Sequence, residues 1–190
     1  MSFILRPEMA PNEIAEITLV AAVAVAKAIR SLTALEAVIK WPNDILIDGK
    51  KVCGILTEMK AEQDTIDFIV LGIGVNVNTS SKDLPKEATS LRSQLRLAGR
   101  SEAVSRIEIV KRILESFETY YNMLRKRGSA PVIEEWKNLS LMIGSRVKVT
   151  LPKRSFEALV HDLDRDGALI VRLDSGVLER VSSGDIGMIR

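Results

Sequence analysis

The stretch 40-KWPNDILIDGKKVCGI-55 predicts a β-hairpin that carries several charged side chains. Two apolar segments flank Asp48 and Gly49, and an Asp-Gly pair in this position is typical of a two-residue hairpin turn. We therefore expect four cross-strand pairs, namely Ile47 with Lys50, Leu46 with Lys51, Ile45 with Val52 and Asp44 with Cys53. Because cross-strand partners share a face, one side of the hairpin should carry Asp44, Leu46, Lys51 and Cys53.

In this register Asp44 and Lys51 are diagonal neighbours, roughly 7–8 Å apart. That distance is too long for a tight ion pair, but it suits two groups that hold two parts of one ligand. A carboxylate can take Mg²⁺ and an ammonium can take an anion, which together favour a phosphate-bearing substrate. The alternative is a solvated turn with a surface lysine, and the hairpin alone leaves that alternative open.

The apolar stretch 69-IVLGIGVNVN-78 predicts a strand with two unlike faces. One face is aliphatic and consists of Ile69, Leu71, Ile73, Val75 and Val77. The other face consists of Gly72, Gly74, Asn76 and Asn78. This second face offers space for a flat ligand and amides for hydrogen bonds, although a strand thinned by glycine to let a helix approach would look the same. The third glycine and the helix start of a dinucleotide-binding loop are missing, which argues against a Rossmann fold.

Further elements are predicted on both sides of these two segments. Strands are expected at residues 1–6 and 38–41, and helices at about 11–32, 90–97, 105–128 and 131–138. The helix after Ser105 starts with a capping box that includes Glu108, and Gly128 ends it. Its apolar residues recur on one face, so one side of this helix should be buried.

The end of the chain changes to short strands, expected at 146–150, 156–162, 168–172 and 176–181. Turns with the sequences 165-RDG-167 and 174-DSG-176 separate them, and this pattern is typical of a small β-barrel. We place the domain boundary at 140–144, which divides the chain into residues 1–140 and 141–190.

Composition limits the classes of function. The 190 residues carry a net charge of +2 and are 46% hydrophobic, which is typical of a soluble globular protein and disfavours nucleic-acid binding. One cysteine and one histidine cannot form a disulfide or a Cys/His metal site, so a cytoplasmic location is expected. The most apolar run, residues 19–26, is far shorter than the roughly 20 residues that span a bilayer, so no membrane association is expected.

Together, 40-KWPNDILIDGKKVCGIL-56, 72-GIGVNVN-78 and the terminal strands resemble the bacterial biotin protein ligases over the whole of residues 1–190. The K-W-P-N-D, K-x-x-G-I-L and G-x-G-x-N motifs of that family occur here in order and at fitting distances. The resemblance implies an α+β fold, in which part of a class II synthetase-like mixed sheet with flanking helices precedes a small SH3-like barrel.

The resemblance also implies an enzymatic reaction in two steps. Biotin attacks ATP to give biotinoyl-AMP and pyrophosphate, and a lysine of biotin carboxyl carrier protein then attacks the mixed anhydride. ATP, Mg²⁺ and biotin are the implied small molecules, and the carrier protein is the implied partner.

Site residues follow from the same resemblance. Lys51 is the implied catalytic residue, because its charge can offset the negative charge of the pentavalent transition state. The implied biotin-binding residues are Lys51, Gly54, Ile55, Leu56 and Gly72. The implied ATP-binding residues are Trp41 beside the adenine, Asn43 orienting the loop or a metal-bound water, Asp44 holding Mg²⁺, and Asn76 at the nucleotide.

The chain departs from the family pattern at its beginning. A serine/threonine-rich segment and a G-R-G-R-x-G-R loop precede the matching strand in family members, and neither motif occurs here. We expect a misassigned start, and the alternatives are a two-piece enzyme and a non-catalytic remnant. The exposed sheet edge predicts self-association as a homodimer. The helix-turn-helix of the repressor subtype is also absent, in keeping with the low net charge.

Two further functions compete with the ligase. One is a non-catalytic module that binds a carrier protein or a second ligase subunit, and the other is a lipoate-attaching relative, against which the K-W-P-N-D cluster and the barrel argue. Among single residues, His161 is expected at the surface and Cys53 as a small buried side chain rather than a reactive thiol. Trp136 should pack between the domains, and Arg190 matches a basic residue near the ATP phosphates in the family.

Overall fold

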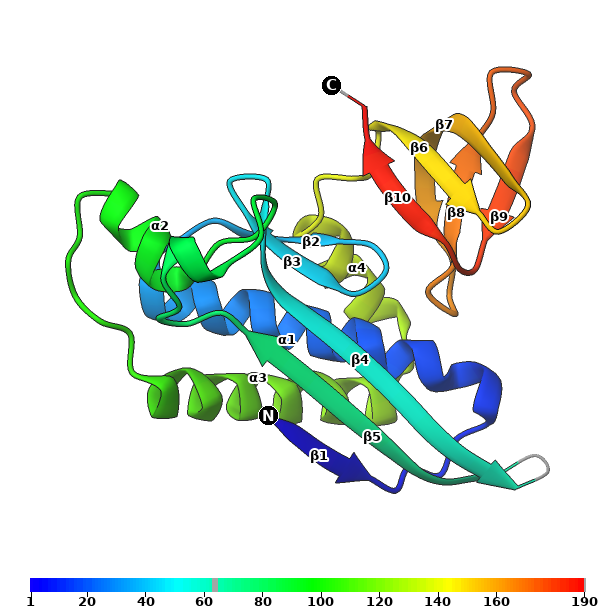
Figure 1. Ribbon diagram of the computed structural model, residues 1–190. Helices are drawn as coiled ribbons and strands as arrows, with labels where there is room; N and C mark the ends of the chain where they lie inside the picture. Colours follow the sequence, from blue (N-terminus) through cyan, green and yellow to red (C-terminus); the bar gives the residue numbers. More distant parts are fainter. Residues whose placement is uncertain (63–64, 190) are drawn as a thin grey trace.

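The computed structural model describes residues 1–62 and 65–189, which form two antiparallel sheets of five strands and a layer of helices (Figure 1). The first sheet has the order β1-β5-β4-β3-β2, with β1 at Ser2–Leu5, β5 at Thr65–Val75, β4 at Lys50–Glu62, β3 at Asp44–Ile47 and β2 at Ala37–Lys40. The predicted α+β class is confirmed. Parallel pairing among the described residues is limited to two isolated bridges, Ile39 with Ser140 and Lys51 with Ala88.

Helices cover one face of the first sheet (Figure 1). The long ones are α1 at Ile14–Thr33, preceded by the 3-10 turn η1 at Pro11–Glu13, and α3 at Arg106–Arg127. Helix α1 is rich in Ala and Val and is buried almost all round, because it packs against strands β2, β3 and β4 and against its neighbour α3. As predicted, Ser105 caps α3 by accepting a hydrogen bond from the Glu108 N–H, and the helix ends at Gly128.

Shorter helices flank these two. They are α2 at Leu91–Leu97, α4 at Ala130–Asn138 and the 3-10 turn η2 at Ser81–Asp83. Trp136 on α4 is fully buried, and Lys137 on the same helix forms an ion pair of 2.6 Å with Asp162 of the second sheet. None of the helices in residues 1–62 and 65–189 is long and apolar enough to cross a membrane.

The opposite face of the first sheet is open. Ile4 on β1 and Leu56 on β4 are 61% and 59% exposed, although both are large aliphatic residues. Strand β5 shows the predicted contrast, because Ile69, Leu71 and Ile73 are buried against the helices whereas Gly72 and Gly74 lie on the open face. Glycine and exposed apolar side chains therefore define the surface available to a ligand.

The predicted hairpin register is half wrong. Ile47 pairs with Lys50 and Leu46 with Lys51 as expected, but the partner of Ile45 is Cys53 and that of Asp44 is Gly54. A β-bulge between Ile45 and Leu46 causes the shift, since Val52 has no partner opposite it. Val52 and Cys53 are consequently both buried, and Cys53 does not share the face of Lys51.

The second sheet has the order β10-β6-β7-β8-β9 and encloses its own core. Its strands are β6 at Arg146–Leu151, β7 at Arg154–Leu163, β8 at Leu169–Arg172, β9 at Leu178–Val181 and β10 at Asp185–Met188. The first four match the predicted strands, whereas β10 was not predicted. His161 is exposed, as expected, and Arg190 lies outside the described residues. The domain division at 140 and 141 stays a prediction.

Candidate functional site

A shallow cavity of about 580 Å³ lies on the open face of the first sheet. It collects six of the residues implied by the sequence, namely Asn43, Lys51, Gly54, Ile55, Leu56 and Gly72. Strands β3, β4 and β5 are adjacent in the sheet, which explains why segments far apart in the chain meet here. Met1, Ser2, Ile73 and Gly74 complete the lining, and of these only Gly74 had a signal in the sequence, through its alternation with Gly72.

The charged centre of the site is a contact between Lys51 and Asp44. The Nζ atom of Lys51 lies 2.5 Å from Oδ1 of Asp44, so the predicted separation, too long for an ion pair, is wrong. The bulge moves Asp44 opposite Gly54, and a long lysine side chain then reaches across the gap. Lys51 remains 46% exposed and Asp44 20% exposed, so the ammonium can also meet a ligand from the open side.

Gly54 makes this contact sterically possible. A Cβ atom at this position would lie 3.2 Å from both Cε and Nζ of Lys51 and 3.7 Å from Oδ1 of Asp44. The first two distances are shorter than ordinary van der Waals contact, so a side chain here would make the end of the lysine shift by a few tenths of an ångström. The glycine in K-x-x-G-I-L therefore gives the lysine its path along the sheet surface.

Asn43 fixes the turn between β2 and β3 to strand β4. The side-chain amide of Asn43 donates a hydrogen bond of 2.7 Å to the backbone carbonyl of Ile55. The backbone carbonyl of Asn43 accepts a hydrogen bond of 3.0 Å from the Ile55 N–H. These two bonds hold the turn at the wall of the cavity. The implied role of Asn43, orienting the loop or a metal-bound water, stays a prediction.

The two asparagines after β5 have different surroundings. Asn76 is half-buried, and its main chain bonds to the carbonyl of Val52 and the N–H of Leu91. The side chain of Asn78 instead bonds to the main chain of Val104, donating at 2.8 Å and accepting at 3.3 Å. The expectation that both amides face a ligand is therefore wrong for Asn78, which fastens the loop before α3. Strand β5 ends at Val75, so strand alternation does not extend to these residues.

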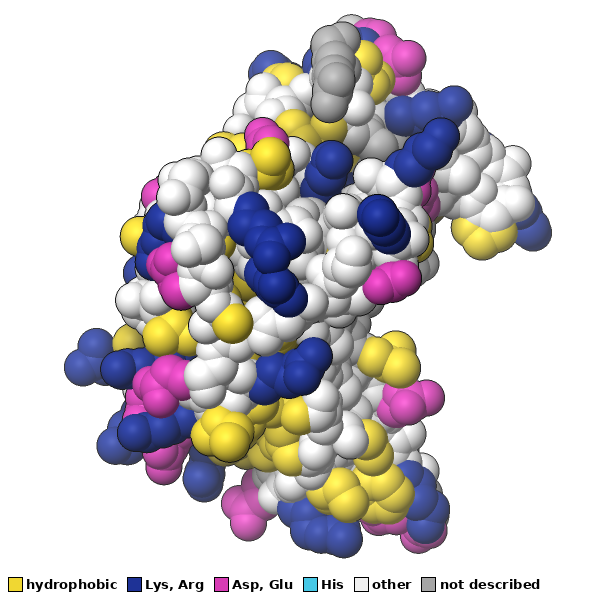
Figure 2. Space-filling model, turned by 60° about the vertical axis from the view of Figure 1, so that its left-hand side comes forward, with side chains coloured by type: hydrophobic (Ala, Val, Ile, Leu, Met, Phe, Trp, Pro, Cys, Tyr) yellow, Lys and Arg dark blue, Asp and Glu magenta, His cyan; other side chains and the backbone are white. Residues whose placement is uncertain are grey.

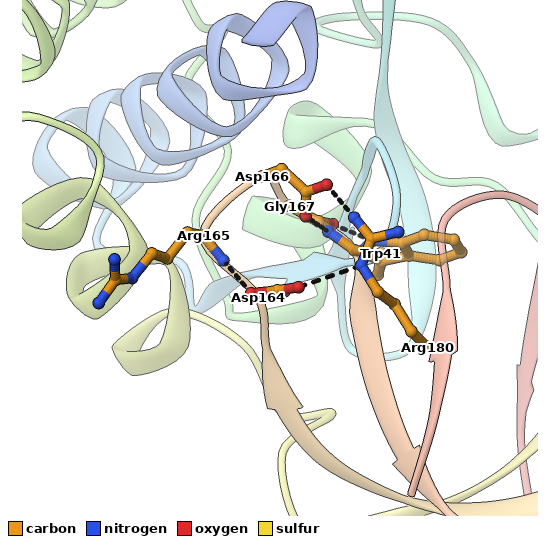
Figure 3. Close-up of polar contacts among 7 residues, drawn as sticks. Trp41, Asp164, Arg165, Asp166, Gly167 and Arg180 are labelled. Atoms are coloured by element: carbon orange, nitrogen blue, oxygen red, sulfur yellow. Dashed lines mark hydrogen bonds and ion pairs between the residues drawn. The ribbon is translucent and has the colours of Figure 1, made fainter. Parts of the chain in front are cut away.

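Trp41 is not among the residues that line the cavity. Its side chain lies against the turn between β7 and β8 of the second sheet (Figure 3). It is 2% exposed, and its indole N–H donates a hydrogen bond of 2.9 Å to the carbonyl of Gly167. Its backbone N–H donates to the sulfur of Met142 at 3.0 Å. These contacts do not support the implied place of Trp41 beside an adenine.

Cys53 is a buried thiol on the helix side of β4. Burial, followed by the nearby carboxylate of Asp44, raises the pKa of this thiol to about 12. The thiol therefore stays protonated at neutral pH and is a poor nucleophile. The expectation of a small buried residue is confirmed.

A second cavity of about 530 Å³ lies beside α2 and the loop that follows β5. Its cationic residues are Lys50, Arg92 and Arg96, and hydroxyl groups of Thr79, Ser80, Ser81, Thr89 and Ser93 surround them. The Nε atom of Arg92 is buried and has no hydrogen-bond partner among the described residues. Figure 2 shows the side of the molecule on which α2 lies, with Lys and Arg side chains grouped in its middle. The sequence patterns did not predict this feature, because its members are dispersed and follow no motif.

Within residues 1–62 and 65–189, no group of three or more His, Cys, Asp and Glu side chains is placed to hold a metal ion. Oδ1 of Asp44 is buried and receives no well-directed hydrogen bond from the described residues. One such carboxylate fits Mg²⁺ only together with phosphate oxygens of a ligand, which is the usual arrangement for Mg²⁺ with nucleotides.

Comparison with known proteins points to one family. Residues 1–76 match the Biotin/lipoate A/B protein ligase family, and residues 142–188 match the Biotin protein ligase C terminal domain. The bifunctional ligase/repressor BirA of Bacillus subtilis is 36% identical over 186 residues, covering 98% of this chain and 57% of that protein. The biotin–[acetyl-CoA-carboxylase] ligase of Mycobacterium tuberculosis is 34% identical over 179 residues, covering 92% of this chain and 62% of that protein.

Solved structures agree with the sequence matches. A point mutant of the biotin protein ligase from Aquifex aeolicus, in complex with biotin, superposes with a TM-score of 0.80 at 25% identity and covers 100% of this chain and 76% of that one. The chain thus spans a little more than half the length of the Bacillus subtilis relative and, along its own full length, follows the fold of 76% of the Aquifex aeolicus chain. With both family models matched in the expected order, the chain belongs to the biotin protein ligase family.

Proposed function

We propose that this chain takes part in biotin–protein ligation, in which ATP activates biotin to biotinoyl-AMP and a lysine of biotin carboxyl carrier protein accepts the biotin. The observation that carries the proposal is the cavity in which Lys51, Asn43, Gly54 and Gly72 meet, since these residues come from the motifs that define the family resemblance. The matches to the two family models support it.

Lys51 has the leading chemical role in this proposal. A carboxylate oxygen of biotin attacks the α-phosphorus of ATP, and the bond from that phosphorus to the leaving pyrophosphate breaks. Negative charge builds up on the non-bridging oxygens at this stage, and the ammonium of Lys51 offsets it. The ion pair with Asp44 holds the ammonium in place before the ligand arrives.

Asp44 has a second role, as a ligand for a cation. Mg²⁺, when bound with ATP, would neutralise phosphate charge, and Asp44, the ion-pair partner of the cavity residue Lys51, is the residue that would hold it. Asn43 keeps Asp44 in position through the two hydrogen bonds to Ile55. These contributions are electrostatic and positional, and neither requires a covalent enzyme intermediate.

The glycine face suits the aliphatic part of biotin. Gly54 and Gly72 leave the sheet surface bare, and Leu56 offers an apolar side chain beside them. Removal of this apolar surface from water would favour binding by about 25 cal/mol for each Å² buried.

For the nucleotide we propose Asn76 together with Arg92. Asn76 follows β5 directly, and Arg92 lines the cationic cavity and has a buried Nε with no hydrogen-bond partner among the described residues. A guanidinium presents several N–H donors and is well suited to phosphate oxygens.

A second candidate function is the docking of a carrier protein or a second subunit, including another copy of this chain. The exposed aliphatic residues Ile4 and Leu56 on the open sheet face favour it, because such residues often mark a contact surface. Binding of a carrier domain in the absence of ATP, weakened by Ile4→Lys, would support this candidate.

The deciding experiment is an adenylation assay. The purified chain is incubated with biotin and ATP, and pyrophosphate release is followed while hydroxylamine traps the activated acid. We expect biotin-dependent release that requires Mg²⁺ and is lost in Lys51→Met. Lipoate in place of biotin separates the two branches of the family model. Absence of release with either acid would contradict a catalytic role for this chain.

A further inference from the structure

The buried Trp41 connects the second sheet to the turn that precedes β3. Trp41 begins the three-residue turn between β2 and β3, and this turn delivers Asn43 to the cavity and Asp44 to Lys51. The tryptophan itself lies in the contact with the second sheet, where its indole N–H bonds to Gly167. Asn43, in the wall of the candidate active site, is therefore only two positions along the chain from Trp41, which contacts the second sheet.

The acceptor of this hydrogen bond belongs to a tightly held turn. Gly167 closes the β7–β8 turn with φ of +83°, and its N–H donates to the carbonyl of Asp164 at 3.0 Å. A Cβ atom at Gly167 would lie 3.4 Å from Cδ1 of Leu19 and 3.5 Å from Cβ of Ala15. The turn is thus lodged between helix α1 and the indole, and its carbonyl has little freedom to move.

Arg180 on β9 braces the turn from the other side (Figure 3). Its Nε donates to the carboxylate of Asp164 at 3.0 Å, and its guanidinium also binds Asp166. The hydrogen bond from the Arg165 N–H, together with the contact with Arg180, lowers the pKa of Asp164. Two carboxylates of one short turn are therefore fixed by a single side chain from a different strand.

From this path we infer that Arg180, the β7–β8 turn and Trp41 form a positioning device by which the second sheet sets the geometry of Asn43 and Asp44. Trp41 and Arg180 are positioning residues, since neither lines the cavity. The expected effect on catalysis rests on the proposed function. The structural coupling between the β7–β8 turn and the β2–β3 turn does not.

The test uses the full chain and compares Arg180→Ala with Arg154→Ala. Arg154 forms an ion pair with Glu179 on the same sheet and is similarly exposed, but it does not touch the β7–β8 turn, so it controls for loss of a surface ion pair. The first readout is NMR of the Trp41 indole N–H and of the Asn43 side-chain amide, assigned with Trp136→Phe and Asn43→Asp variants. The second readout is pyrophosphate release with biotin and ATP.

In Arg180→Ala we expect faster hydrogen exchange at the Trp41 indole and a displaced Asn43 amide signal. The kcat of pyrophosphate release should fall on the order of tenfold, with little change in the KM for biotin. Arg154→Ala should leave the exchange rate of the Trp41 indole, the Asn43 amide signal and the kcat unchanged. Trp41→Phe, which keeps a ring but removes the donor, should reproduce the Asn43 change without alteration of the second sheet.

Two results would overturn the inference. In one, the Trp41 indole loosens in Arg180→Ala but the Asn43 amide stays as it is in the unmodified chain. In the other, Arg180→Ala and Arg154→Ala behave alike in both NMR signals. A chain with no adenylation activity would remove the proposed function, but the NMR comparison would still decide whether the two turns are coupled.

Discussion

Lys51 and Asp44 form a direct ion pair, with 2.5 Å between Nζ and Oδ1, although they are separated by the whole β3–β4 hairpin turn. The pair exists because a bulge at Val52 sets Asp44 opposite Gly54, over which the lysine side chain lies. Its contribution to stability is small, about 0.2–1 kcal/mol, because both groups keep contact with solvent. The pair is therefore better explained as preparation of a charged site than as a source of folding energy.

Replacement of Lys51 by Met should remove activity without unfolding the protein. We expect pyrophosphate release to fall by on the order of 10²- to 10³-fold, because the transition-state charge loses its partner. The measurement is the rate at saturating biotin and ATP. Lys60→Met is the matched control, since Lys60 lies on the same strand and pairs with Asp67 outside the cavity. Equal losses in the two variants would argue against a special role for Lys51.

Gly54→Ala should weaken the site through Lys51. The added methyl group would sit 3.2 Å from the end of the lysine side chain and make it shift by a few tenths of an ångström relative to Asp44. We expect a loss of activity of roughly tenfold, with a change of less than about 1 kcal/mol in the free energy of unfolding. Gly187→Ala on β10 is the control, because nothing lies within 4 Å of a Cβ there. An active Gly54→Ala protein would show that the observed lysine path is not needed.

Alanine substitutions of Asn78 and Asn76 should have different effects, the first on stability and the second on ATP binding. Asn78→Ala removes two hydrogen bonds to Val104 and should lower the free energy of unfolding by about 1–3 kcal/mol. Asn76→Ala should have a smaller effect on stability and should raise the KM for ATP. Urea unfolding and steady-state kinetics of both variants check this. A larger stability loss in Asn76→Ala than in Asn78→Ala would contradict the assignment.

The Cys53 thiol should make stability depend on alkaline pH. Its pKa is raised from 9.0 to about 12 in the folded protein, so between these values the folded state holds a proton that the unfolded state has lost. Raising the pH through this window therefore favours unfolding, by up to about 1.4 kcal/mol per pH unit. Urea unfolding at pH 8 and pH 10 measures the effect, and the difference between the unmodified chain and Cys53→Ala isolates the thiol from other groups. Identical pH slopes for the two proteins would refute the raised pKa.

Local patterns were enough to predict much of the fold. The turn at Asp48 and Gly49, the cap at Ser105 and the end of α3 at Gly128 were predicted correctly, because each depends on the backbone preferences of a few neighbouring residues. The contrast between Ile73 and Gly74 was also correct, since alternation along a strand fixes which side chains share a face.

What the sequence by itself determined, then, is most of the helices and strands, the aliphatic and glycine faces of β5, and the resemblance on which the Lys51 assignment depends. Tertiary structure decided the bulge at Val52, the contact between Lys51 and Asp44, and the burial of Trp41 against Gly167. The physical reason is the range of the interactions. A periodic pattern shows which side chains of one segment face the solvent and which face the core. A bulge instead depends on the partner strand, and the indole hydrogen bond of Trp41 depends on a residue 126 positions away.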